Sequence, residues 1–143
     1  MAAVAGYSGT PLQKKLGFEE GWTVAVLGDA PEGFADQFTG LDIRRSLPAA
    51  GRPPASAALA FVRSGSELQR VVVGRVLPAL PDDGMVWVAW PKKASGVPTD
   101  LTENVVRDVI LPTGWVDVKV CAIDDTWSGL KFVKRLKERR RPS

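Results

Sequence analysis

Apolar residues recur along the chain in short runs that alternate between two spacings. The continuous runs at residues 23–27, 57–62 and 85–90 are typical of strands buried on both faces of a sheet. After Ser64 and after Asp100, apolar residues instead recur three and four positions apart, as on the buried face of a helix. This alternation of strands and helices predicts an α/β domain with a mostly parallel sheet.

Shorter elements complete the pattern. Thr10 and Pro11 predict the start of a helix within residues 7–17, with Gly17 as its end. A brief helix is predicted at residues 34–38 and a short strand at 42–45, before a loop rich in Pro, Ala and Gly.

The helix predicted near residue 100 has its own start signal. Asp100 with Glu103 three positions later has the spacing of a capping box, so we expect Asp100 to cap this helix.

The last third predicts two strands, residues 115–123 and 130–136, joined by a turn in an antiparallel hairpin. The expected fold is therefore a three-layer, mostly parallel Rossmann-like sheet with helices on both faces and a C-terminal antiparallel hairpin. We expect residues 1–136 to form a single domain, followed by a basic tail at 137–143.

Composition narrows the possible functions. The chain has 143 residues and a net charge of +3, but seven basic residues and only one acid lie from Lys131 onward, so the rest is net negative. Nucleic acid is therefore an unlikely partner for the body of the protein. The sequence has no apolar run that could span a membrane and no signal-peptide pattern, which predicts a cytoplasmic protein without a membrane partner.

The lack of any histidine removes the usual general base and zinc ligand, and a single cysteine excludes a disulfide within the chain. No catalytic residue and no metal ligand is assigned from the sequence.

Ligands of doubly wound sheets bind beyond the carboxyl ends of the strands, so the loops at residues 28–33, 63–67 and 91–102 are of most interest. In the last of these, ammonium groups, hydroxyls and backbone amides together would suit an anion. The residues predicted to bind it are Lys92, Lys93, Ser95 and Thr99. The alternative is that both lysines are simply solvated.

Two further candidates lie near the same edge of the predicted sheet. Asp29 follows the first buried strand, and Trp127 is expected at a strand end facing the crevice. The adjacent Asp124 and Asp125 are more typical of a capped turn than of a cation site, because neighbouring residues of an extended chain point in opposite directions.

Three stretches carry a family resemblance: GYSGTPLQKKLG at residues 6–17, WVAWPKKASGVPTDLTENVVRD at 87–108 and VDVKVCAIDDTWSGLKFV at 116–133. The chain resembles the bacterial family known as domain of unknown function 3052, which implies no assigned chemistry. The order of elements also resembles a class I methyltransferase sheet, shortened by one strand-helix unit, and implies a site for S-adenosylmethionine. Two positions depart from that pattern, since Pro31 lies between the glycines of the first loop and the second strand ends in Arg44 and Arg45.

Two functions remain open. The first is a non-catalytic binding or regulatory protein for a small anionic ligand or a protein partner, with the cofactor unknown. The alternative is a divergent S-adenosylmethionine-dependent methyltransferase or other transferase, in which Asp29, Glu32 or Asp124 would contact cofactor or substrate.

Overall fold

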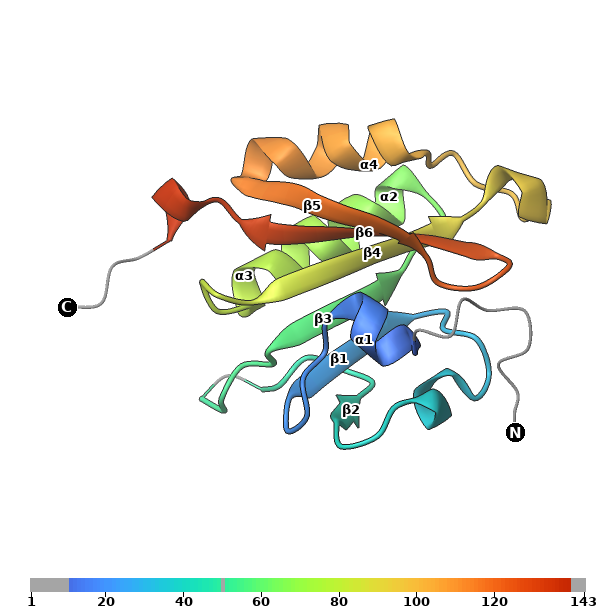
Figure 1. Cartoon of the computed structure of the whole chain (residues 1–143). Coiled ribbons are helices and arrows are strands. Elements are labelled where there is room, and N and C mark those ends of the chain that lie inside the picture. The colour runs from blue at the N-terminus through green and yellow to red at the C-terminus, as the bar shows by residue number, and fades with distance from the viewer. Residues whose placement is uncertain (1–10, 50, 140–143) are drawn as a thin grey trace.

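A sheet with the strand order β2-β1-β3-β4-β6-β5 runs through the protein (Figure 1). The computed structural model describes residues 11–49 and 51–139. Its strands are β1 (Thr23–Gly28), β2 (Asp42–Arg44), β3 (Ala57–Phe61), β4 (Met85–Pro91), β5 (Trp115–Ala122) and β6 (Trp127–Lys134). The first four strands are parallel, and β6 and β5 add an antiparallel hairpin at one edge. The predicted fold class is confirmed.

The centre of the sheet is apolar on both faces. All five residues of β3 are buried, and Leu59 pairs with Val26 of β1 and Trp87 of β4. Strands covered from both sides read as continuous apolar runs, which explains why these segments show no alternation of polar and apolar residues.

Two long helical segments cover one face of the sheet. The first is a continuous helix made of α2 (Gly65–Glu67), η2 (Leu68–Val76), which has the wider π-type turn, and α3 (Leu77–Ala79). The second is α4 (Glu103–Ile110), extended by the 3₁₀ turn η4 (Leu111–Thr113). Their apolar residues form one core with this face, which includes Leu68, Val72, Val76, Val106 and Ile110. We call this the helical face.

The opposite face is covered by much less helix. It carries α1 (Leu12–Leu16), which is five residues long, and the 3₁₀ turn η1 (Phe34–Gln37). Its packing includes a series of aromatic contacts between Phe18, Phe38, Phe34, Phe61 and Trp127, with centroid separations of 4.9 to 6.0 Å. We call this the aromatic face.

The start of α4 differs from the prediction. Thr102 caps this helix, because its Oγ1 accepts a hydrogen bond from the backbone N–H of Val105 at 3.2 Å. Asp100 instead accepts a hydrogen bond from the backbone N–H of Gly65 at 2.9 Å, and so ties the α4 loop to the start of α2. The capping prediction failed because the true cap is the residue three positions before Val105, whereas Asp100 lies too far upstream.

The hairpin also begins earlier than predicted. Asp124 accepts hydrogen bonds from the backbone N–H groups of Thr126 and Trp127, both at 2.8 Å, so the turn closes within a few residues. Pairing therefore starts at Trp127 rather than at Leu130, and β6 ends at Lys134 rather than at Leu136. The capped turn expected for the two acids is confirmed for Asp124.

Two short turns complete the elements, η3 (Lys93–Ser95) and η5 (Leu136–Glu138). Residues 7–10 of the predicted first helix and residues 140–143 of the predicted tail lie outside the described residues. Within residues 11–49 and 51–139, no helix has both the length and the apolar character to cross a membrane.

Candidate functional site

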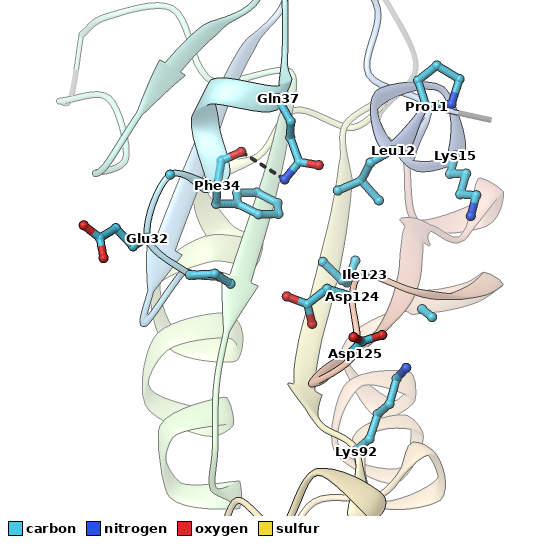
Figure 2. Close-up of a pocket in the computed structure, with 13 residues that line it drawn as sticks. Pro11, Leu12, Lys15, Glu32, Phe34, Gln37, Lys92, Ile123, Asp124 and Asp125 are labelled. Carbon is cyan, nitrogen blue, oxygen red and sulfur yellow. Dashed lines mark hydrogen bonds between the residues drawn. The ribbon is translucent and has the colours of Figure 1, made fainter. Parts of the chain in front are cut away.

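A hollow of about 380 Å³ opens on the aromatic face, between α1, η1 and the turn that joins β5 to β6 (Figure 2). Lys92, the residue after β4, lies at one end of it, and Glu32 and Phe34 of the loop after β1 line another wall. The hollow is therefore at the carboxyl ends of parallel strands, which is where ligands of such sheets bind. Its volume lies within the range of small-molecule sites.

The inner surface of the hollow is apolar. Leu12 of α1, Phe34 of η1 and Ile123 from the end of β5 face one another across it. Phe34 and Ile123 are buried, and the Phe34 ring packs edge-on against Phe61 at 5.2 Å. The hollow thus has an ordered apolar floor, suited to a ring or a short hydrocarbon chain.

Charged side chains of both signs stand around this floor. Lys15 and Lys92 bring two ammonium groups, while Glu32, Asp124 and Asp125 bring carboxylates. Asp124 is already engaged by the turn. No ion pair found within the described residues uses Lys15 or Lys92, so both ammonium groups are available to an acidic ligand.

Helix α1 is fixed in place as a wall of the hollow. The indole N–H of Trp87 donates to the carbonyl oxygen of Leu16 at 2.8 Å in the core. The side chain of Gln13 exchanges two hydrogen bonds of 3.0 Å with the backbone of Thr39. Because these bonds tie α1 both to the sheet and to the loop after η1, the shape of the hollow does not depend on apolar contact alone.

A second cluster lies above the ends of β1 and β3. Arg63, just after β3, forms an ion pair with Asp29, just after β1, and its guanidinium lies 5.9 Å from the ring centroid of Trp127. The hydroxyl of Thr99 donates to the carbonyl oxygen of Arg63. Arg63 therefore connects three of the residues singled out in the sequence.

The close approach of β1 and β3 at this point requires a glycine. Gly28 has a φ of +85°, and a Cβ atom there would lie 2.1 Å from the carbonyl oxygen of Phe61. No side chain fits at that distance, so Gly28 lets the chain leave β1 beside the end of β3 and brings Asp29 to Arg63.

The structure separates the six predicted ligand residues. Lys92 alone lines the hollow, whereas Asp29, Thr99 and the buried Trp127 belong to the Arg63 cluster. In the η3 turn, Ser95 donates to the carbonyl oxygen of Lys92 at 2.7 Å and accepts from the N–H of Val97 at 3.2 Å, next to the exposed Lys93. The hydroxyls of Ser95 and Thr99 thus hold the loop.

Sequence reasoning missed Lys15, Phe34 and Arg63 as site residues. A signal existed for Arg63, because it follows the buried apolar run of residues 57–62 in a parallel sheet. No local signal existed for Lys15, which reaches the site only because α1 folds back across the sheet (Figure 1).

The hollow offers groups that could bind a ligand. The chain has no histidine, and within the described ranges no three Cys, Asp or Glu side chains gather closely enough to hold a metal ion. An apolar floor and two ammonium groups can hold a ligand by burial and charge.

The chain matches no protein-family profile and no curated protein sequence. Solved structures do resemble it. One is a protein of the NADB-Rossmann superfamily from Streptococcus agalactiae, with a TM-score of 0.51 and 8% identity over 93% of this chain and 70% of that chain.

Another is LepI in complex with SAM, with a TM-score of 0.50 and 11% identity over 88% of this chain and 47% of that chain. The antibiotic-resistance methyltransferase Kmr follows, with a TM-score of 0.47 and 14% identity over 86% and 91%. At such identities the likeness concerns the fold alone, and that fold is a Rossmann-like sheet.

Proposed function

We propose that this protein is a non-catalytic binding or regulatory domain whose hollow holds a small acidic molecule with an apolar part. The observation that carries the proposal is the pairing of an apolar floor with two ammonium groups at the carboxyl edge of the sheet. The acidic group of the ligand would lie near Lys15 and Lys92, and its apolar part on Phe34 and Ile123.

The charges of the hollow favour an acidic group at one end only. Glu32 and Asp125 would repel a ligand with negative charge along its whole length, so a single terminal carboxylate or phosphate suits the hollow better than a polyphosphate. The same carboxylates would suit a ligand that also bears an amino group.

Other expectations from the sequence remain part of this proposal. One is a role in binding for Lys93, Ser95, Thr99, Asp29 and Trp127. Another is membership of domain of unknown function 3052. The last two are a single domain at residues 1–136 with a tail at 137–143, and a cytoplasmic location.

Thermal unfolding with a ligand panel tests the proposal. Adenosine monophosphate is a suitable first probe, because it joins one phosphate to an aromatic base. A ligand at about 100 times its dissociation constant stabilises a fold by roughly 2.7 kcal/mol. Lys92→Ala should abolish the ligand-induced rise in Tm, whereas Lys14→Ala, which removes an exposed lysine outside the hollow, should retain it. An unchanged response in Lys92→Ala would refute the proposal for that ligand.

A second candidate, methyl transfer from S-adenosylmethionine, is favoured by the fold and by the likeness to LepI bound to SAM. The residues of this chain do not fit that molecule well. The loop after β1 places four residues, among them Pro31, between Gly28 and Gly33, and Asp29 is held by Arg63. The strand β2 ends in Arg44, where the methyltransferase pattern has an acid for the ribose.

The two candidates give different results in the same assay. A rise in Tm with S-adenosylmethionine that survives Lys92→Ala and disappears in Asp29→Asn would favour the methyltransferase. No rise at millimolar S-adenosylmethionine, together with a response to an acidic ligand, would favour the binding domain.

A further inference from the structure

Two lysines stand directly opposite each other on the hairpin, beside the end of α1. Lys119 of β5 pairs in register with Lys131 of β6, and residues paired in this way present their side chains on the same face. The amino group of Lys119 donates to the carbonyl oxygen of Lys15 at 2.9 Å. The amino group of Lys131 lies 3.6 Å from the position that a Cβ atom of Gly17 would take. Both therefore reach the C-terminal end of α1 on the aromatic face.

These lysines have no acidic partner among the residues that the structure describes. None of the ion pairs found within the described residues involves Lys15, Lys119 or Lys131. Burial and the charge of Lys119 lower the pKa of Lys131. Like charges directly opposite each other in a sheet are destabilising, so this arrangement costs stability unless another charge compensates it.

The nearby thiol does not supply that charge. Cys121 is half-buried and feels the ammonium groups of both Lys119 and Lys15, which favour the thiolate. Burial has the larger effect and raises the pKa of the Cys121 thiol above its ordinary value. The thiol is therefore neutral at physiological pH, and the positive charge remains.

Support of α1 explains only part of this arrangement. Cations near the end of a helix interact favourably with its carbonyl groups, and Lys119 does so through its bond to Lys15. The amino group of Lys131, however, makes no hydrogen bond in the part of the chain that the structure describes. A helix of five residues offers little dipole to hold a second, partly buried cation.

We propose that Lys119 and Lys131 bind a phosphate-type oxyanion. Both amino groups lie at the C-terminal end of α1, Lys119 at the carbonyl oxygen of Lys15 and Lys131 beside Gly17, so one anion there could accept a hydrogen bond from each. This site lies next to the hollow but uses different cations, because the hollow is lined by Lys15 and Lys92 and not by Lys119 or Lys131.

Inorganic pyrophosphate is the probe for this site. It should raise the Tm of the wild-type protein above that in sodium chloride of equal ionic strength. It should also raise the pKa of Lys131, measured by NMR of the ¹³C-methylated lysines, because a bound anion favours the ammonium form. Lys131→Met keeps the length of the side chain and should lose the whole Tm response. No response in the wild type, or an equal response in Lys131→Met, would overturn the proposal.

Matched variants separate this site from its surroundings. Lys137→Met removes the same charge from the exposed η5 turn and should keep the full response. Lys92→Ala should keep it as well. If Lys92→Ala abolishes the response and Lys131→Met does not, the anion binds in the hollow, so this inference fails while the proposed function stands.

The unliganded Tm gives an independent check. Lys131→Met should leave it unchanged or raise it, because one of two opposed like charges is removed. A lower Tm with an intact pyrophosphate response would show that Lys131 only supports α1, against the proposal. If Lys131→Met does not fold, the exposed Lys119→Met serves in its place, with the same expected loss of response.

Discussion

The helical face and the aromatic face of the sheet are built in different ways. Two helical segments, α2-η2-α3 and α4, seal the helical face with aliphatic side chains. Among the described residues the aromatic face carries α1 and η1 alone, and its cover depends on aromatic rings and on a few hydrogen bonds to α1. The hollow and the lysine pair Lys119 and Lys131 lie beside these short elements. The comparison predicts that truncations cost more stability on the helical face, and it agrees with the proposal that a ligand binds on the aromatic face.

Truncation of core side chains should give the largest difference between the faces in the loss of unfolding free energy. Ile110 is completely buried against the helical face, so Ile110→Ala should lower the free energy of unfolding by about 2 to 5 kcal/mol. Leu12 is only partly buried at the wall of the hollow, and Leu12→Ala should cost less than about 1.5 kcal/mol. Urea unfolding measures both, and equal losses would contradict the division between the faces.

Loss of the hydrogen bond between Trp87 and α1 should have the next largest effect on stability. Trp87→Phe removes the N–H that satisfies the carbonyl oxygen of Leu16, and an unsatisfied buried carbonyl costs about 1 to 3 kcal/mol. Amide hydrogen exchange should accelerate most in α1, with a smaller change in α4. Uniform acceleration across both helices would mean that α1 is not a separate unit of stability.

The corrected cap of α4 gives a smaller effect on the helical face. Thr102→Ala removes the acceptor for the N–H of Val105 and should lower the free energy of unfolding by about 0.5 to 2 kcal/mol. Thr113→Ala, at the other end of the same helical segment, serves as a comparison without loss of the N-cap. If Thr102→Ala has no effect, the hydrogen bond from the Gly65 N–H to Asp100 is sufficient to fix the start of the helix.

The smallest effect is expected at the Arg63 cluster. The side chains of Arg63 and Asp29 are 50% and 64% exposed, so solvent screens their ion pair. Arg63→Gln should therefore change the free energy of unfolding by at most about 1 kcal/mol. Differential scanning calorimetry at low and high salt should give nearly the same Tm difference from wild type. A much larger loss would make this cluster part of the core.

The sequence was sufficient for the fold and insufficient for the site. The central strands were predictable because burial on both faces leaves continuous apolar runs, as in β3. The hollow was not, because Leu12, Phe34 and Ile123 come from three distant segments that only the tertiary fold brings together. Among the predicted ligand residues, only Lys92 lines the hollow, although Asp29 also directly follows a strand, so a position at a strand end did not by itself locate the hollow.

Trp87 of β4 depends on a hydrogen-bond acceptor in α1, 71 positions earlier in the chain. The buried indole N–H of Trp87 needs a hydrogen-bond acceptor, and the carbonyl oxygen of Leu16 supplies it. In a related chain that lacked α1, phenylalanine or leucine would serve better at position 87. The presence of α1 and a tryptophan at position 87 are therefore expected to covary among related chains.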